Sequence, residues 1–216
     1  GMFHLFTHAM FKACLFLGAG CIIHAVHSNE MAMMGGLRKY MPITHITFLF
    51  SCLAIAGIPF FSGFSSKDEI ITACMQYSPV VGWIMTGIAA MTAFYMFRLY
   101  YGIFWGTENV EAHEHHTPHE APLTMTIPLI VLCVITVGVG VLSTIGGFTD
   151  SNSAFAHLVS FGSFVSAEGT DYAIHFNTQI ALTSTIIAIL SICLATYIYK
   201  GNRRSEERFS RNAETD

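Results

Sequence analysis

Long apolar blocks, each near the length needed to cross a lipid bilayer, constrain this chain more than any other feature. Four of them cover about residues 2–25, 80–105, 122–143 and 176–199. A helix needs about 20 mostly apolar residues to span the hydrocarbon core, and these blocks lack the patterns of soluble elements. Only 11% of the residues are charged, against about 25% in a soluble domain. The sequence therefore predicts an all-α, polytopic membrane protein, and nothing in it suggests nucleic-acid binding.

A fifth apolar block, residues 43–77, is too long for one regular crossing. Its centre holds the stretch GIPFFSG, residues 57–63. Pro59 has no backbone N–H to donate and the two glycines remove side-chain restraint, so a helix is expected to break here. The block is either two short crossings or one crossing broken at mid-membrane. Irregular backbone at that depth is tolerated only inside protein or beside a wet cavity.

The distribution of basic residues favours the single broken crossing. Cytoplasmic loops of membrane proteins are enriched in Lys and Arg. With one broken crossing, Arg38, Lys39 and the basic tail after residue 200 all fall on the same side. Two short crossings would move Arg38 and Lys39 to the opposite side. We therefore expect about five transmembrane helices, with the tail in the cytoplasm.

This topology divides the chain into four parts. Residues 1–105 hold the core helices, and residues 106–121 form a cytoplasmic loop rich in His and Glu. Residues 122–200 supply two further transmembrane helices joined by an external polar connection, and residues 201–216 form a basic cytoplasmic tail. The first helix begins with no lead-in, so we expect the sequence to be a piece of a longer protein.

Three ionisable side chains lie along one face of the first apolar block. His4, His8 and Lys12 are spaced by four residues, so successive side chains differ by about 40° around a helix. A charge at the bilayer centre costs at least about 2.5–3.5 kcal/mol on insertion scales. We therefore expect this face to be turned away from lipid and enclosed. The alternative is that the histidines bond neighbouring helices and the lysine extends to the interface.

A second cluster, SSKDEI at residues 65–70, directly follows the predicted break. Its ionisable residues are Lys67, Asp68 and Glu69. One interpretation is structural, with Ser and Asp capping the second half-helix and Lys67 paired to a carboxylate. The other is functional, because transporters often place ion sites at broken helices, where freed backbone groups act on the ion.

The two clusters together predict a proton relay. An amine withdrawn from water releases its proton more readily, and a second amine nearby acts in the same direction. Lys12 and Lys67 would then exchange protons, with His4 and His8 passing them through water. The chain shows no motif for a metal, a nucleotide or a covalent nucleophile, so we expect no catalytic nucleophile, no cofactor site and no metal site in it.

Other ionisable residues have simpler interpretations. Arg98 lies near the cytoplasmic end of its helix, where extension to the interface suffices. His24 and His27 close the first helix and are expected to cap its C-terminus. The six cysteines are scattered without a C-x-x-C pair, which predicts neither disulfides nor zinc. A solvated loop is preferred over metal binding for the four histidines of the cytoplasmic loop, which are His113, His115, His116 and His119.

Several stretches resemble one known family, in this order: HLFTHAMFKACLFLGAG, MGGLRKYMP, LAIAGIPFFSGFSSKDEI, FYMFRLYYGIFWG and HEAPLTMTIPL. They are similar to subunit L of bacterial NADH–quinone oxidoreductase (respiratory complex I), whose mitochondrial counterpart is NADH dehydrogenase subunit 5. The resemblance is strong over residues 1–143 and reduces to one more helix over residues 144–200. It departs from the family at GIPFF, where Gly-Ile-Pro-Pro is commoner.

The resemblance implies a fold of two inverted five-helix repeats, of which this chain is most of the second. The first repeat and a long lateral helix are missing from the sequence. The family's proton path falls on five residues here, which are His4, His8, Lys12, Lys67 and Asp68. By the resemblance, Lys12 and His8 belong to a central hydrophilic axis, and Lys67 connects it to the external side.

The resemblance also implies a role and a setting. The chain would be a subunit of a proton-pumping oxidoreductase, a translocase, without a redox centre of its own. NADH, FMN, iron–sulfur clusters and quinone are expected in other subunits. The implied location is the bacterial inner (cytoplasmic) membrane. The implied partners are the lipid bilayer and the other membrane subunits of complex I, especially the adjacent antiporter-like subunit.

Three other functions stay open at this point. The chain could be a subunit of an Mrp-type Na⁺/H⁺ antiporter or of a membrane-bound hydrogenase, because both share this ancestry. It could also be a membrane scaffold whose buried charges only hold helices together. The HEAP stretch and the run around Arg98 favour complex I over the Mrp type.

Overall fold

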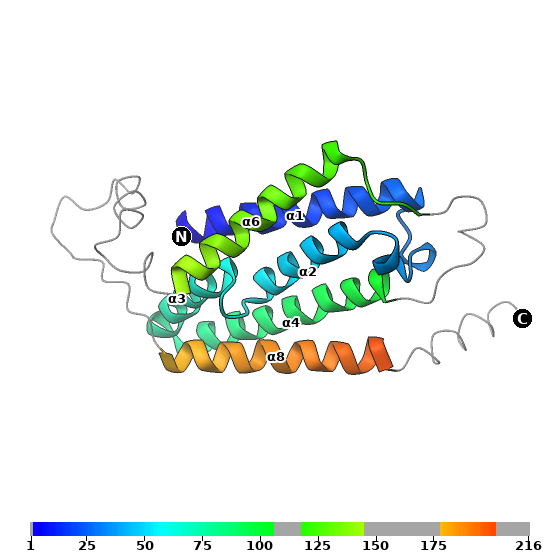
Figure 1. The fold of residues 1–216 in the computed structure, drawn as a ribbon. Helices are drawn as coiled ribbons and strands as arrows, with labels where there is room; N and C mark the ends of the chain where they lie inside the picture. The colour runs from blue at the N-terminus through cyan, green and yellow to red at the C-terminus, as the bar shows by residue number, and fades with distance from the viewer. Residues whose placement is uncertain (1, 106–117, 145–177, 202–216) are drawn as a thin grey trace, which may run out of the picture.

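The computed structural model describes residues 2–105, 118–144 and 178–201. These residues are helical and contain no strand, which confirms the all-α prediction. Most of the histidine-rich loop, the external connection and the basic tail lie outside the described residues, and so do the predictions made for them. The helices run side by side, with the N-terminus of α1 and the start of α8 at the same end (Figure 1).

The described residues form six α-helices and two short 3₁₀ helices, most of which begin and end within a residue or two of the predicted bounds. In chain order they are α1 (Met2–Val26), η1 (Met31–Met33), η2 (Leu37–Lys39), α2 (Pro42–Ala56), α3 (Ser62–Tyr77), α4 (Pro79–Phe104), α6 (Leu123–Thr144) and α8 (Thr178–Gly201). A single residue, Ser78, separates α3 from α4, as the Ser-Pro pair at this point predicts.

Four helices are long and apolar enough to cross a membrane, namely Phe3–Val26, Pro79–Phe104, Leu123–Ser143 and Thr178–Lys200. The apolar helix α2 has only 15 residues. At about 1.5 Å per residue it falls short of the roughly 30 Å hydrocarbon core. Together with the 16 residues of α3, which follows after a short break, it is more than long enough for one crossing. The structure thus agrees with about five crossings, one of them broken.

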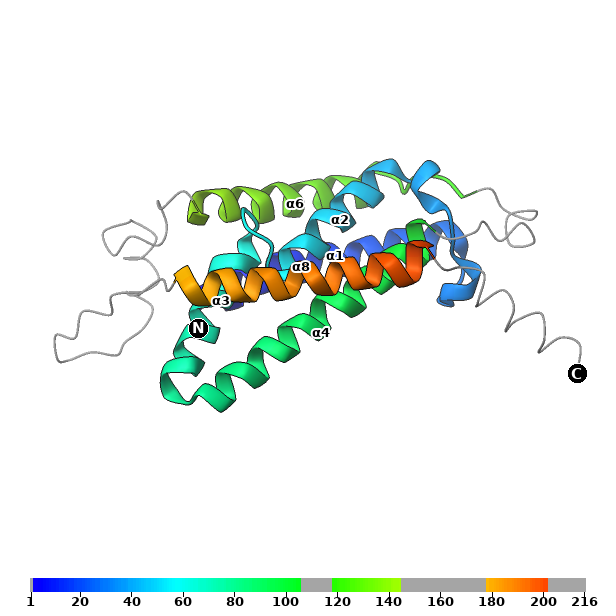
Figure 2. The ribbon, with the colours of Figure 1, turned by 90° about the horizontal axis from the view of Figure 1, so that it is seen from below.

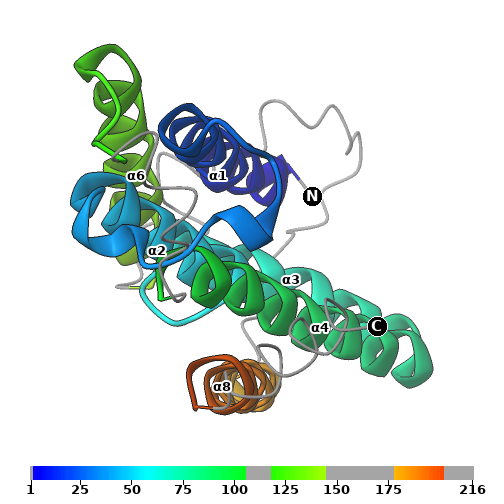
Figure 3. The same ribbon diagram turned by 90° about the vertical axis from the view of Figure 1, so that its right-hand side faces the viewer.

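The helix α2 lies at the centre of the bundle. It packs against α1, α4 and α6, whereas α8 packs mainly on α4. Viewed end-on, the α1–α6 pair and α8 lie on opposite sides of the bundle (Figure 3). Figure 2 shows α4 diverging from α8 towards the end where α4 joins α3.

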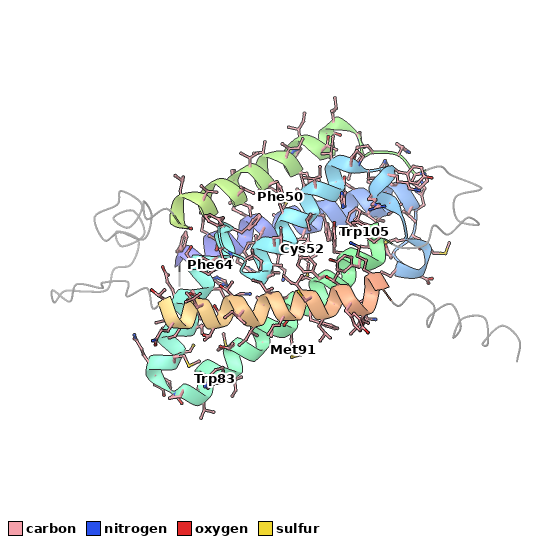
Figure 4. All side chains as sticks on the ribbon, turned by 60° about the horizontal axis from the view of Figure 1, so that its bottom comes forward. Phe50, Cys52, Phe64, Trp83, Met91 and Trp105 are labelled. Carbon is pink, nitrogen blue, oxygen red and sulfur yellow. The ribbon has the colours of Figure 1, made fainter. Side chains whose placement is uncertain are left out.

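Side-chain burial follows this arrangement. Cys52 of α2 is fully buried at the centre, while Trp83 and Met91 of α4 point away from the bundle (Figure 4) and are 58% and 71% exposed. Large apolar side chains on an outer surface suit contact with lipid tails. All six cysteines are free thiols.

The break between α2 and α3 follows from its sequence. Gly57 takes a left-handed φ of 80° and ends α2. The Gly57 N–H donates to the Ala54 carbonyl, and the N–H of the next residue donates to the Leu53 carbonyl. This pair of hydrogen bonds is a Schellman motif. In a continued helix the Ile55 carbonyl would accept from residue 59, but Pro59 has no N–H. The break therefore leaves the Ile55 carbonyl free for another donor.

Small residues allow neighbouring helices to close tightly around the break. A Cβ on Gly63 would run into the carbonyl oxygen of Ala54, so the start of α3 lies directly on the end of α2. A Cβ on Gly140 of α6 would run into the backbone of residues 60–62. The irregular backbone is therefore covered by α6 on one side, which suits a break within a membrane helix.

The start of α2 is held by a carboxylate from the segment before α6. The Ile43 N–H donates to Glu120 Oε2 at 2.8 Å, and the Thr44 hydroxyl donates to Glu120 Oε1 at 2.6 Å. Backbone N–H groups in the first turn of a helix lack intrahelical partners and favour a negative charge nearby. Glu120 thus ties the HEAP stretch to the central helix.

Candidate functional site

His4 joins α1 to α3 through a hydroxyl group. Its Nδ1 lies 3.1 Å from Ser66 Oγ, and Thr7 Oγ1 lies 3.0 Å from the same oxygen. The Ser66 hydroxyl donates to the Ser62 carbonyl at 3.1 Å, so its oxygen can accept hydrogen bonds from α1. The two clusters that the sequence places 62 residues apart therefore meet directly at this serine.

The two histidines of α1 lie next to each other. The rings of His4 and His8 stack with centroids 5.8 Å apart, and His8 meets the ring of Phe11 edge-on at 5.4 Å. Both histidines are partly buried. The four-residue spacing thus places them on one face, as the sequence predicts.

Lys67 uses the carbonyl that the helix break leaves free. Its Nζ donates to the Ile55 oxygen at 2.7 Å, the acceptor that Pro59 cannot satisfy. The Lys67 side chain also passes over Gly57, where a Cβ would lie 3.6 Å from Lys67 Cδ. The irregular backbone at the break therefore supplies the hydrogen-bond acceptor for the Lys67 amine.

Asp68 is buried and only partly satisfied. Its side chain is 3% exposed, and Oδ1 accepts from the Ser184 hydroxyl of α8 at 2.7 Å. Within the described part of the chain, Asp68 Oδ2 has no hydrogen-bond partner. A buried polar atom without a partner is costly and marks a place where a proton or a water molecule would fit.

The capping interpretation of SSKDEI is wrong. The helix α3 begins at Ser62, and its cap residue Phe61 makes no side-chain hydrogen bond. Ser65 and Asp68 therefore lie inside the helix. Lys67 is bonded to a carbonyl, and no described carboxylate is in ion-pair contact with it.

Three polar residues of α3 instead bond three different helices. Ser66 contacts α1 through His4, as described above. The Ser65 hydroxyl donates to Ser143 of α6 at 2.9 Å, and Asp68 accepts from α8. Hydroxyl groups both donate and accept, so such a seam can hold a proton and hand it on.

Lys12 is not enclosed by the described residues. Its side chain is exposed on the surface of the described chain, so these residues do not supply the enclosure that the sequence predicts. The physical reason is the choice of face, because α1 packs on its neighbours through Phe11, Cys14 and Ile22, and Lys12 lies outside that packed face. The described residues complete only part of the predicted relay.

The other ionisable residues discussed from the sequence are Arg98 and the histidines outside the two clusters. Arg98 is exposed, with Cζ 5.5 Å from the centroid of the Tyr199 ring. The rings of His24 and His27 lie 6.1 Å apart, and His119 lies 6.4 Å from His24. Where the structure describes the chain, no group of three or more His, Cys, Asp or Glu residues could hold a metal. The other loop histidines, His113, His115 and His116, lie outside the described residues.

Sequence reasoning overlooked a third partly buried histidine. His45 of α2 is partly buried, and its Nε2 lies 2.7 Å from the Tyr100 hydroxyl of α4. The Trp105 indole N–H donates to the same hydroxyl at 3.3 Å. The signal was present, because His45 is an ionisable residue in an apolar helix just as His4 and His8 are. The hydroxyl groups of Ser143 and Ser184, which bond α3, carried no such signal.

Comparison with known proteins places the chain in a family. Residues 1–93 match the family described as NADH:quinone oxidoreductase/Mrp antiporter, transmembrane. The chain is 40% identical over 239 residues to NAD(P)H-quinone oxidoreductase chain 5 of a Picosynechococcus strain, covering 97% of this chain and 35% of that protein. It is 39% identical over 224 residues to the chloroplastic subunit 5 of Chaetosphaeridium globosum, covering 97% of this chain and 33% of the relative.

A relative named subunit L points to the same family. NADH-quinone oxidoreductase subunit L of Neisseria meningitidis is 46% identical over 164 residues, which cover 66% of this chain and 24% of that protein. The chain thus spans about a third of the length of the curated relatives it matches, or less. The matches, the apolar helices and the broken α2–α3 crossing agree with one another. This multi-pass membrane chain belongs to the subunit 5/subunit L family of NAD(P)H–quinone oxidoreductases.

Proposed function

We propose that the chain is part of a proton-translocating membrane subunit of NADH–quinone oxidoreductase. The observation that carries this proposal is the bond from Lys67 Nζ to the carbonyl freed by the helix break. An amine held by one neutral acceptor, without an ion pair to a described carboxylate, can exist in the charged or the neutral form. That property is what a proton carrier needs.

The proposed path runs along the polar face of α3. Lys67 takes up or releases a proton, and Asp68, with an unbonded Oδ2, is the adjacent acceptor. Ser66 links this pair to His4, and the stacked rings of His4 and His8 lead along α1 towards Lys12. Gaps longer than a hydrogen bond would be filled by water, which suits a polar seam.

The exposed Lys12 is consistent with a longer protein. The relatives extend well beyond the matched region, and a lysine in mid-helix does not remain in contact with lipid without a large cost. We infer that another segment of the full-length protein, or a neighbouring subunit, covers this face of α1 and completes the path there.

The relatives' names support membership in an oxidoreductase complex, and the finer parts of the proposed setting rest on the resemblance to subunit L. The full-length protein would be one membrane subunit of an oxidoreductase complex in the bacterial inner membrane. Its partners would be other membrane subunits, including an adjacent antiporter-like one. NADH, FMN, iron–sulfur clusters and quinone would be bound by other subunits, and quinone reduction would drive the protons.

The substitution Lys67→Ala in the full-length subunit tests the proposal. Proton translocation, measured in inverted membrane vesicles during NADH oxidation, should fall by roughly tenfold or more. Lys39→Ala is the matched control, because Lys39 is exposed in a turn away from the break. Normal proton translocation at normal assembly would show that these charges only hold helices together.

A cation/proton antiporter is the second candidate, because the matched family's description also names the Mrp antiporter. Expression of the full-length protein in a host lacking its sodium/proton antiporters separates the two. Growth at high sodium that depends on Lys67 would favour the antiporter. Failure to rescue, together with NADH-dependent translocation, supports the oxidoreductase subunit.

A further inference from the structure

Two cations share one aromatic ring at the end of the bundle opposite the helix break. Arg38 Cζ lies 3.9 Å from the centroid of the Trp105 ring, and Lys200 Nζ lies 4.3 Å from the same centroid. Three separate elements supply the group, because Arg38 is on η2, Trp105 follows α4 and Lys200 is in the last turn of α8. Figure 4 shows Trp105 at this end of α4.

The ring is a fixed platform. The Trp105 indole N–H donates to the Tyr100 hydroxyl at 3.3 Å, and that hydroxyl is itself in contact with His45 Nε2 at 2.7 Å. Trp105 is half-buried, whereas Arg38 and Lys200 are exposed. The Trp105 ring is thus fixed by a hydrogen bond inside the protein, while the two charged groups are exposed at the surface.

The charges of this group are not compensated by the described chain. Neither Arg38 nor Lys200 is in ion-pair contact with a described carboxylate. A guanidinium stacked on a ring keeps the N–H groups along its edge available, and an ammonium has three donors. Two like charges over one ring repel each other, and an anion bound by both would remove that repulsion.

The location points to the edge of the bilayer. Trp105 follows the end of the candidate span Pro79–Phe104, and Lys200 is the last residue of the candidate span Thr178–Lys200. Tryptophan is enriched at membrane interfaces, and basic groups between helices at this level bind anionic headgroups. Exposed apolar side chains of α8, such as Leu194 and Tyr197, continue from the charged end along the surface that acyl chains would cover.

The geometry points to a binding site for the phosphate group of an anionic phospholipid, formed by Arg38, Lys200 and Trp105. Arg38 and Lys200 donate to the phosphate oxygens, and the Trp105 ring keeps both cations close to its centroid. The acyl chains lie along α8. The site is separate from the proposed proton path, because Arg38, Lys200 and Trp105 take no part in that path.

A simpler account is that Lys200 only complements the C-terminal end of α8. That account does not explain why Arg38 from a distant turn lies over the same ring. It also predicts no preference between lipids, so lipid binding separates the two accounts.

The test uses the full-length subunit in its complex, reconstituted with photoactivatable phosphatidylglycerol or phosphatidylcholine. Crosslinked peptides around Trp105 are quantified by mass spectrometry. The phosphatidylglycerol probe should label this peptide in the wild type, and the double variant Arg38→Gln/Lys200→Gln should reduce labelling about tenfold. The matched control Lys39→Gln removes a neighbouring exposed cation of the same turn and should leave labelling unchanged.

Two further arms complete the test. The variant Arg38→Lys/Lys200→Arg keeps both charges and should be labelled to nearly the wild-type level. Excess inorganic phosphate should not compete, because the lipid is also held by its chains. Equal labelling of the wild type and the double Gln variant, equal labelling by phosphatidylcholine, or displacement by inorganic phosphate would each overturn the site as a phospholipid site.

Discussion

The two lysines of the proposed proton path lie in contrasting surroundings. Lys67 lies beside the helix break and donates to the Ile55 carbonyl, whereas Lys12 is exposed on α1 and makes no hydrogen bond within the described chain. Lys12 was predicted from the cost of a charge in an apolar helix, and Lys67 from its place directly after a helix break. The comparison teaches that the described part of this chain supplies a hydrogen-bond partner and partial burial for Lys67, and neither for Lys12.

The largest expected effect concerns packing at the break. Gly63→Ala should lower the free energy of unfolding of the full-length protein by about 3 kcal/mol, because the added Cβ would run into the Ala54 carbonyl oxygen. Denaturant titration in detergent, followed by circular dichroism, measures it. Gly87→Ala is the control, since no heavy atom lies within 4 Å of its added Cβ, and it should be neutral or slightly stabilising. Equal effects of the two would mean that α3 does not close on α2.

The second largest effect on stability is expected at the hydrogen bond between α8 and Asp68. Ser184→Ala removes the donor to a buried carboxyl group that already has one unbonded oxygen. The free energy of unfolding should fall by about 2 kcal/mol. Thr183→Ala, which removes only an exposed bond within α8, should change it by less than about 0.5 kcal/mol in the same titration. A Ser184 variant as stable as the Thr183 variant would place α8 away from Asp68.

The link between α1 and α3 is weaker. Ser66→Ala removes the hydroxyl that contacts both His4 and Thr7, at an expected cost of about 1 kcal/mol. Proton translocation should fall as well if this serine joins the two clusters. Ser191→Ala, whose hydroxyl bonds only within α8, is the control. If stability falls as expected but proton translocation is unchanged, then Ser66 does not carry protons between His4 and Lys67.

The smallest effect on stability is expected at Lys12. Lys12→Met should change the free energy of unfolding by less than about 0.5 kcal/mol, because no described residue bonds to its amine. It should nevertheless lower proton translocation strongly, and the two measurements on one preparation test both statements. A loss of stability comparable with that of Ser184→Ala would contradict the contrast drawn between the two lysines.

Much of the fold and part of the site could be predicted because they depend on local chemistry. Helix length follows from the run of apolar residues. The break follows from Gly57 and Pro59, which act on the backbone within one turn of their own positions. The shared face of His4 and His8 follows from helical geometry alone. The mistaken capping of α3 also has a local reason, because Ser62 begins the helix earlier than the charged cluster suggests.

The amino-acid sequence by itself thus determined that the chain is a bundle of membrane helices, where its crossing breaks, and which residues are chemically unusual. Only the tertiary structure decided which of them meet. Ser184 lies 116 residues from Asp68, and Ser66 lies 62 residues from His4, so neither contact is encoded in a local pattern. The exposure of Lys12 has the same origin, because the side of a helix that is covered depends on which other helices pack against it.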